Sequence, residues 1–342
     1  SYTNRFGGKT YTYEGNQEGA GVIYKDDKEK GEAYIITNYH VVYESTYNKS
    51  IVDNIYVYLY GGETMLYYDT QQSFTTQANS DEKAIKAEFI GGTQTYDIAV
   101  LKISDSSVYK NSVAKPVSVR NSDELRAGEP AIVIGNPENE GISVTTGVVS
   151  RTSEHITMYA SDKTTVVTFR VIRTDAAVNS GNSGGGLFDK SGNLIGIVNA
   201  KTTSDDVDNM AYAIPTAIAI RCADLIIERN TKTPSIDIPK VGVTLTISDC
   251  YATIDDNGLI DTIEEVAVES VSSGYPSDGL LQAGDKIVSV TLKGKTTVIT
   301  KRHTLIDLML EARLGNTLTY NIIRDGKELS VDVVLTKIET VA

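Results

Sequence analysis

Short apolar runs separated by turn residues fill the first 210 positions of the chain. Their β-branched and aromatic residues favour strands, and their frequency indicates β-barrels or a β-sandwich. The runs lie at residues 33–37, 55–60, 98–103, 131–134, 166–171 and 194–198. Only residues 216–229 show a helical period, with apolar positions recurring on one face. This pattern predicts a mostly β domain that ends in a helix.

A second pattern begins after residues 231–239, whose sequence TKTPSIDIP contains two prolines and indicates a linker between domains. Strand-like segments follow at 241–247, 266–271, 286–290, 318–323 and 329–335, with a helical segment at 303–312. Several strands with one or two helices in roughly 100 residues are typical of a small α+β domain or a small barrel. Residues 61–83 are polar and aperiodic, so we expect a long surface loop there.

Charge and composition narrow the range of partners. The net charge of −13 argues against nucleic-acid binding, because contacts to phosphates require concentrated Lys and Arg, and it also disfavours an anionic membrane surface. No stretch approaches the roughly 20 apolar residues that span a bilayer. Because the chain opens at Ser1 rather than Met, we expect any export signal or membrane anchor to lie upstream.

The two cysteines are too few for a disulfide-stapled scaffold. Cys222 lies on the apolar stripe of the predicted helix and is expected to be buried. A bridge from Cys222 to Cys250 is not favoured but stays open, because their spacing does not settle the geometry.

Residues 181–185, Gly-Asn-Ser-Gly-Gly, carry the first candidate chemistry. Ser183 can act as a nucleophile if a base removes its proton and donors await the developing oxyanion. The flanking glycines allow a sharp turn and a close approach of substrate to the main chain, although a plain hairpin turn would use the same residues. The motif also fits the nucleophile elbow of α/β-hydrolases. An elbow requires a helix after the serine, whereas GGLFDKSGNLIGIV is typical of strand, turn and strand.

His40 and Asp97 are the candidates for the base that activates Ser183 and for the carboxylate beside that base. His40 follows an apolar strand, at a position that could present its imidazole to a cleft. Asp97 comes directly before a wholly apolar strand, where a buried carboxylate needs hydrogen-bond donors such as an imidazole N–H. Each could have a structural role alone, an exposed or core histidine and a turn-capping aspartate. The chain order His40, Asp97, Ser183 matches the chymotrypsin type, and together the three predict a catalytic triad.

Six segments around these residues resemble bacterial HtrA-type (Deg) proteases. They are TNYHVV (37–42), YDIAVLKI (96–103), AGEPAIVIGNP (127–137), VTTGVVS (144–150), RTDAAVNSGNSGGGLFDKSGNLIGIV (173–198) and AYAIP (211–215). Beyond the linker, VGVTL (241–245) and GLLQAGDKIVSV (279–290) are similar to a PDZ domain. The resemblance implies a mostly β fold, a chymotrypsin-like double β-barrel protease domain followed by a smaller α+β PDZ-like domain. The expected divisions are an N-terminal segment 1–14, a protease domain 15–230 with barrels at about 15–120 and 121–215, a linker 231–239 and a PDZ-like domain 240–338.

The resemblance also implies roles for particular residues. His40 would be the general base, Asp97 the orienting carboxylate and Ser183 the nucleophile, with Gly181, Asn182 and Ser183 supplying the oxyanion hole. The substrate pocket would include Ala177, six residues before Ser183, together with Val178, Asn199, Ala200 and Lys201. Since no carboxylate lies at the pocket base, we expect cleavage after small or medium aliphatic residues rather than basic ones, although Lys201 complicates this expectation. The PDZ-like domain would bind peptide C-termini by strand addition, with Val241, Gly242 and Val243 receiving the carboxylate.

Residues 253–264, TIDDNGLIDTIE, nearly match a calcium-binding loop. Its first position is Thr rather than Asp and its flanks are strand-like, so a β-hairpin with Asn-Gly at the tip is favoured. No zinc-ligand spacing exists, and we expect neither a metal nor a cofactor.

The leading hypothesis is an ATP-independent serine endopeptidase that acts on unfolded or misassembled exported proteins. By resemblance it would work outside the cytoplasm, secreted, at the cell surface or anchored through an upstream segment. It would form a homotrimer through N-terminal residues such as Phe6, Tyr11 and Tyr13. Two alternatives are a chaperone-like binding protein with an inactive triad, and an esterase that cleaves small esters but not peptides.

Overall fold

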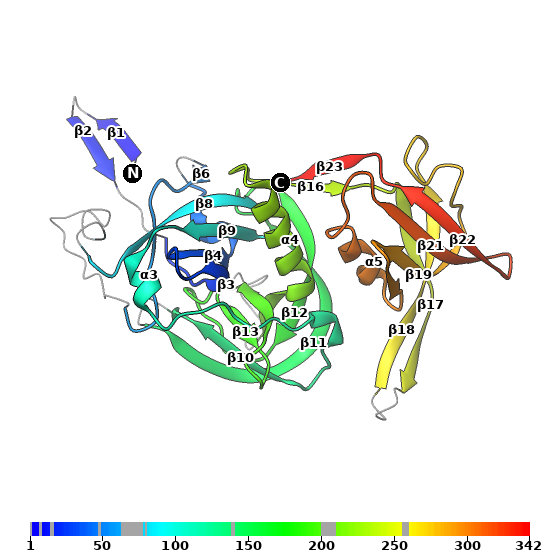
Figure 1. The fold of residues 1–342 in the computed structure, drawn as a ribbon, viewed down its shortest axis with the longest axis horizontal. Coiled ribbons are helices and arrows are strands. Elements are labelled where there is room, and N and C mark those ends of the chain that lie inside the picture. Colours follow the sequence, from blue (N-terminus) through cyan, green and yellow to red (C-terminus); the bar gives the residue numbers. More distant parts are fainter. Residues whose placement is uncertain are drawn as a thin grey trace. The chain divides into compact units, whose positions relative to one another are not determined.

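In the computed structural model the described residues are 2–6, 9–13, 17–46, 49–62, 78, 81–137, 141–199, 210–254 and 260–342, with the side chains of 1–16 and of Asp261 left out. Strands dominate these residues, which confirms the mostly β class (Figure 1). The chain divides into two compact units, residues 1–236 with residue 342 and residues 237–341. A short hairpin of β1 (Tyr2–Phe6) and β2 (Lys9–Tyr13) opens the first unit.

The first half of this unit is a five-stranded antiparallel sheet. Its order is β3 (Val22–Asp27), β4 (Glu32–Thr37), β9 (Ile98–Ile103), β8 (Ile85–Thr93) and β7 (Ile55–Val57), beside the small pair β5 (Tyr43–Glu44) and β6 (Ser50–Ile51). β9 is buried along almost its whole length, because it lies in the middle of the sheet. Apolar side chains of β4, β8 and β9 form one core with Tyr39 and Tyr109.

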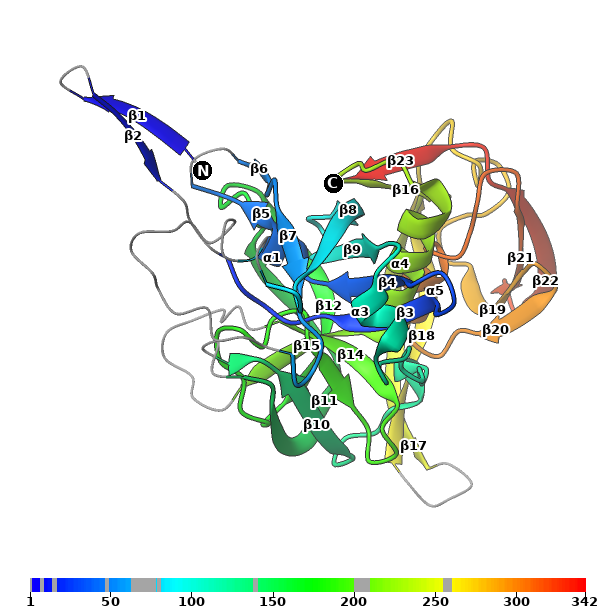
Figure 2. The same ribbon diagram turned by 60° about the vertical axis from the view of Figure 1, so that its left-hand side comes forward.

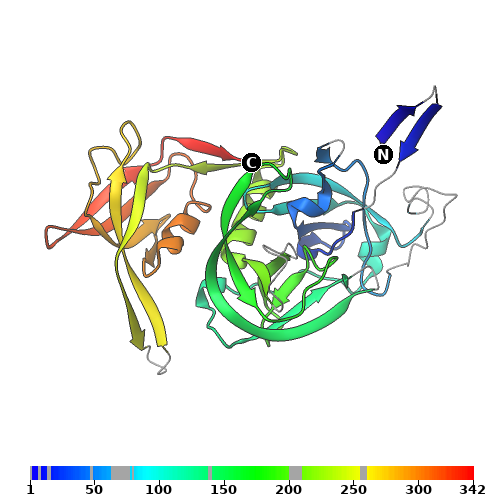
Figure 3. The same ribbon diagram turned by 180° about the vertical axis from the view of Figure 1, so that it is seen from behind.

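The second half is a closed six-stranded barrel, in the order β10-β11-β12-β15-β14-β13. Its strands are β10 (Pro130–Gly135), β11 (Ser143–Tyr159), β12 (Val166–Thr174), β13 (Gly186–Phe188), β14 (Leu194–Asn199) and β15 (Ala211–Pro215). β11 is long and strongly curved (Figure 3), and its pairing with β12 is interrupted by irregularities around Arg151. Such bulges bend a strand, which lets one strand follow the barrel wall.

The helix predicted at 216–229 is α4 (Thr216–Arg229), which packs against β8 and β9 of the sheet and against β14 and β15 of the barrel (Figure 2). Its buried face includes Ile218, Cys222 and Leu225, and it ends at Asn230, whose backbone is left-handed. Cys222 is buried and Cys250 exposed, and they form no bridge. The described part of this unit also contains the short helices α1 (Tyr39–Val42) and α3 (Ser107–Asn111) and the 3₁₀ turn η1 (Ser122–Glu124). Across the described ranges, none of the helices has both the length and the apolar character that crossing a bilayer requires.

The second unit is built on the sheet β17-β18-β19-β21-β22, with β20 paired to β19. Its elements are β17 (Val243–Ile254), β18 (Ile260–Val271), β19 (Lys286–Leu292), β20 (Lys295–Val298), α5 (Arg302–Leu308), β21 (Thr317–Arg324) and β22 (Lys327–Val334). The predicted linker contains β16 (Ile236–Pro239), which pairs with β23 (Ile338–Val341), a strand that the sequence pattern did not indicate. β17 and β18 stay paired up to Ile254 and Ile260, while residues 255–259 of the calcium-like motif lie outside the described residues.

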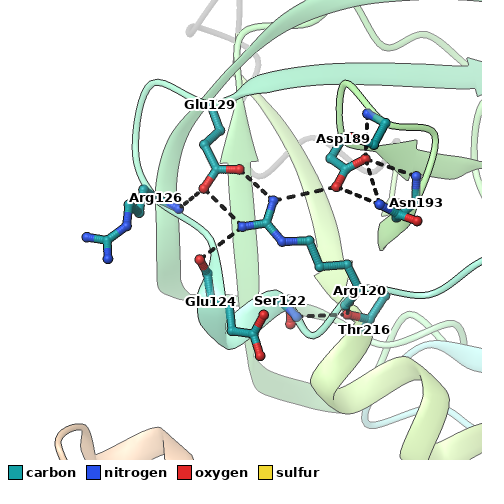
Figure 4. Close-up of polar contacts among 9 residues, drawn as sticks. Arg120, Ser122, Glu124, Arg126, Glu129, Asp189, Asn193 and Thr216 are labelled. Carbon is teal, nitrogen blue, oxygen red and sulfur yellow. Dashed lines mark hydrogen bonds and ion pairs between the residues drawn. The ribbon is translucent and has the colours of Figure 1, made fainter. Parts of the chain in front are cut away.

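Arg120 joins three parts of the first unit (Figure 4). Its guanidinium forms two bonds to the Glu129 carboxylate, of 2.6 and 3.2 Å, and lies 3.5 Å from Asp189 in the β13–β14 turn. Its carbonyl accepts a hydrogen bond from Thr216 Oγ1 at the start of α4. Burial would raise the pKa of Glu129, but the bonds from Arg120 and from the Arg126 N–H outweigh this effect and lower it. The network therefore stabilises the folded state while Glu129 is ionised.

We expect Arg120→Ala to lower the free energy of unfolding by about 1–3 kcal/mol at neutral pH, because two carboxylates lose their cation. A carboxylate with a lowered pKa in the folded state stabilises it above the ordinary Glu pKa, and this contribution disappears as the pH falls through the lowered value. The difference between variant and wild type should therefore shrink in acid. Denaturant unfolding at several pH values measures this difference in stability. Arg126→Ala is the control, because the Arg126 side chain points away from Glu129 and the substitution keeps the main-chain N–H that bonds to Glu129 (Figure 4). A difference independent of pH would contradict this account.

Candidate active site

His40, Asp97 and Ser183 meet in the first unit. The Nδ1 atom of His40 lies 2.6 Å from Asp97 Oδ2, and its Nε2 atom lies 2.9 Å from Ser183 Oγ. His40 comes from the single turn of α1 rather than from a strand end, Asp97 from the turn between β8 and β9, and Ser183 from the loop between β12 and β13. Asp97 is 2% exposed and Ser183 6%, so both are shielded from water. The three side chains thus form one continuous hydrogen-bonded chain.

The carboxylate of Asp97 is surrounded by donors. Oδ1 accepts a 2.9 Å bond from the main-chain N–H of His40, and Oδ2 accepts a 3.0 Å bond from Asn199 Nδ2 in addition to its bond with the imidazole. Hydrogen bonds to the charged form of a carboxyl group favour ionisation and fix its orientation. The amide of Asn199, a residue that the sequence placed in the substrate pocket, therefore helps to hold Asp97.

The main chain around Ser183 is held from two sides. The Ser183 carbonyl accepts a bond from the Ala20 N–H at 2.8 Å, and the Gly184 N–H donates to the Val198 carbonyl at 3.0 Å. Gly184 has a φ of +85°, and a Cβ there would lie 2.2 Å from both the Ala20 carbonyl oxygen and Thr37 Oγ1. Only glycine fits this close packing. Ala20, which the sequence analysis did not single out, thus positions the serine through its backbone.

The turn before Ser183 contains two further residues of the motif with main-chain N–H groups, Gly181 and Asn182. Gly181 has a φ of +92°, which glycine tolerates better than any other residue. The N–H of Asn182 donates to the Asn179 carbonyl at 3.1 Å, and its buried side chain packs against Gly135. Asn182 therefore uses its N–H inside the loop.

This arrangement has the three parts of an activated nucleophile: a hydroxyl, a base within hydrogen-bond reach, and a group that orients the base. Residues 19–197 match the trypsin-like peptidase domain family. The chain is 32% identical over 325 residues to the serine protease Do-like HtrA of Bacillus subtilis, covering 93% of this chain and 63% of that protein. The protein of the same name from Lactococcus lactis subsp. lactis is 32% identical over 333 residues, covering 94% of this chain and 71% of that protein. The chain belongs to the HtrA family of serine proteases.

Other comparisons agree with this family. Residues 239–335 match the PDZ domain family. A solved structure of the HtrA-type protease AlgW with a decapeptide shares 25% sequence identity and a TM-score of 0.53, covering 94% of this chain and 82% of that one. The family resemblance and the fold class predicted from the sequence are thereby confirmed. The chain spans less than two thirds of the Bacillus subtilis HtrA protein.

The residues that the sequence analysis expected in a substrate pocket lie in different surroundings. Ala177 is exposed, and its carbonyl accepts a 2.7 Å bond from Thr145 Oγ1. Val178 is half-buried against the barrel core. Ala200 and Lys201 lie outside the described residues, as do the side chains of Phe6, Tyr11 and Tyr13.

The PDZ residues expected to bind a carboxylate lie at the start of β17. Val241 belongs to the core of the second unit, Gly242 has a φ of +87°, and Val243 packs on that core. The carbonyls of Val241 and Gly242 accept bonds from Ser277 and Ser272, which tie this loop to residues 272–278. Within the described ranges, no cluster of three or more His, Cys, Asp or Glu side chains could hold a metal ion.

Proposed function

We propose that this HtrA chain is an endopeptidase that hydrolyses peptide bonds of unfolded or misassembled proteins outside the cytoplasm, with Ser183 as nucleophile, His40 as general base and Asp97 as orienting carboxylate. The single observation that carries the proposal is the position of the His40 ring. Its two nitrogens lie 2.6 Å from the Asp97 carboxylate and 2.9 Å from the Ser183 hydroxyl. This is the geometry that proton transfer from serine requires.

The reaction follows from these contacts. As Ser183 Oγ bonds to the substrate carbonyl carbon, its proton passes to His40 Nε2. The C–N bond then breaks, and the same proton passes to the leaving amine, which leaves an ester on Ser183. A water molecule gives one proton to His40 and bonds to the ester carbon, and the C–Oγ bond breaks as Ser183 regains that proton. Asp97 stays ionised throughout and stabilises the imidazolium.

The oxyanion of each tetrahedral intermediate needs donors at the point where its charge develops. The sequence suggested Gly181, Asn182 and Ser183. Because the Asn182 N–H already donates to Asn179, we assign the oxyanion hole to the N–H groups of Gly181 and Ser183. Ala177 and Val178 bring no charge to the substrate pocket, which supports cleavage after small or medium aliphatic residues.

The PDZ-like domain would bind peptide C-termini. This expectation is supported by the position of β17, which is an edge strand of the sheet and contacts α5. An edge strand beside a helix can accept an extended peptide as an added strand. We expect a peptide with a free carboxylate to bind and its amidated form to bind at least about tenfold more weakly, because the loss of a charged hydrogen-bonding group costs more than 1.4 kcal/mol. Equal affinities by fluorescence anisotropy would contradict carboxylate recognition.

Location and assembly rest on the family resemblance alone. It supports an extracytoplasmic protein, and a homotrimer formed through the N-terminal segment. Sedimentation of the chain, with and without residues 1–14, measures whether a trimer forms and whether it needs that segment.

The activity is tested with an unfolded, alkylated protein as substrate and the folded protein as comparison. Mass spectrometry should find fragments from the unfolded substrate, with aliphatic rather than basic residues at the new C-termini. Ser183→Ala should abolish them, since loss of a triad member typically costs several orders of magnitude in kcat. Binding without cleavage would favour a chaperone-like protein, and hydrolysis of small esters alone would favour an esterase. Either result would overturn the proposed function.

A further inference from the structure

Asp97 adopts a backbone conformation that needs support. Its φ is +50°, in the left-handed region, where a residue other than glycine is less stable than in the usual regions. Such conformations persist only when their surroundings hold them, and they are concentrated at functional sites. The N–H of Asp97 donates a long bond, 3.3 Å, to the Gln94 carbonyl.

Stronger contacts reach the carbonyl of Asp97. It accepts a 2.9 Å bond from Asn38 Nδ2 and a 3.1 Å bond from the Tyr39 N–H. Asn38 is 0% exposed, so the amide bond is shielded from water. Only the nitrogen of the amide can donate to a carbonyl oxygen, which fixes the orientation of the Asn38 side chain. Residues 38–40 therefore contact both the main chain and the carboxylate of Asp97.

The Asn38 side chain lowers the stability of the fold at this position. Its Oδ1 atom is buried, and the described part of the chain offers it no hydrogen-bond partner. A buried acceptor without a hydrogen-bond partner lowers the stability of a folded protein. Asn38 also precedes α1, where an asparagine side chain commonly caps the helix, yet it makes no capping bond. The observed hydrogen bond of its side chain goes to Asp97, so capping of the helix by this side chain does not explain its presence.

We propose that Asn38 is a positioning residue for catalysis, which holds the Asp97 backbone in its left-handed conformation and so aims the carboxylate at His40. This inference rests on the proposed function, because it assigns Asn38 a role in the same triad. Asn38 itself contacts no reacting atom. Without its amide, the Asp97 carbonyl loses this 2.9 Å bond, and the turn can relax. The carboxylate then spends less time in line with His40 Nδ1.

The test replaces the amide while keeping its shape. Asn38→Leu has the same number of side-chain heavy atoms but can neither donate to Asp97 nor leave an acceptor unsatisfied. We expect kcat per active site to fall about 10–100-fold with KM changed less than about twofold, since small misplacements of catalytic groups have effects of this size. The melting temperature should stay the same or rise. Asn38→Ala should show the same change in kcat if leucine fits poorly.

Active sites are counted with a fluorophosphonate, so that misfolded chains do not lower the measured kcat. Asn193→Leu is the matched control, because Asn193 is also an amide within the protease domain but binds Asp189. It should leave kcat per active site unchanged. Unchanged kcat in both Asn38 variants, or a loss explained by fewer labelled sites, would overturn the proposal.

Proton NMR gives a second readout that needs no turnover. The proton shared by His40 and Asp97 should resonate far downfield in the wild type and shift or broaden in the Asn38 variants. An unaltered resonance would overturn the positioning role even if the chain cleaves proteins. An altered resonance in a chain that cleaves nothing would support the positioning role and refute the proposed function.

Discussion

Asp97→Asn should lower kcat/KM by about 10⁴-fold while the protein stays folded. Three donors point at the two carboxylate oxygens: the His40 N–H, the His40 ring and the Asn199 amide. An asparagine at position 97 must bring its NH₂ group against at least one of them. If that group faces His40 Nδ1, the ring carries its proton on Nε2 and cannot accept the proton of Ser183.

Steady-state hydrolysis of a peptide substrate measures this effect. The control is Asp162→Asn, in the β11–β12 turn, where the carboxylate accepts bonds from Thr164 and Thr165 and contacts none of the triad residues. That variant should keep wild-type activity. If Asp97→Asn retained more than about one tenth of kcat/KM, the carboxylate would not be the group that orients His40.

Arg324→Ala should destabilise the PDZ-like domain by about 3–5 kcal/mol, because it leaves a buried carboxylate without its cation. Arg324 forms two 2.6 Å bonds to the carboxylate of Asp285, which is 0% exposed, and a third bond to the Leu280 carbonyl. The carboxylate also accepts a bond from the Gln282 N–H, which fixes the loop before β19.

Denaturant unfolding followed by a probe in residues 237–341 measures the loss. Lys327→Ala is the matched control, since Lys327 is an exposed cation that lies opposite Arg324 in the register of the β21–β22 hairpin. It should change stability by less than about 0.5 kcal/mol. Equal effects of the two substitutions would show that the buried ion pair does not hold this domain together.

Strands with a regular buried face were predictable from the sequence. β9 and β14 are continuous apolar runs because they lie in the interior of the sheet and the barrel, and the apolar stripe of α4 follows from its position between them. β11 was not predicted over its length. Its exposed side chains and bulges leave few buried positions, so no period of two appears in the sequence. β23 pairs with a strand roughly 100 residues earlier, and local sequence does not encode such pairing.

The residues of the candidate site were also only partly predictable from the sequence. His40, Asp97 and Ser183 could be named because few residue types perform this chemistry and their chain order is informative. The bonds of Asn38, Ala20 and Asn199 depend on how distant segments come together, with Asn199 lying 102 residues from Asp97. Each is an ordinary polar or small residue in the sequence. Only the fold shows that they hold the triad.

We propose Ser183 as the nucleophile and His40 as the base that activates it. Covalent labelling with a fluorophosphonate probe, followed by peptide mapping, identifies the nucleophile without a substrate. We expect one label per chain, attached to Ser183, with a labelling rate that falls by orders of magnitude in His40→Ala. A label on another residue, or equal labelling rates with and without the imidazole, would contradict it.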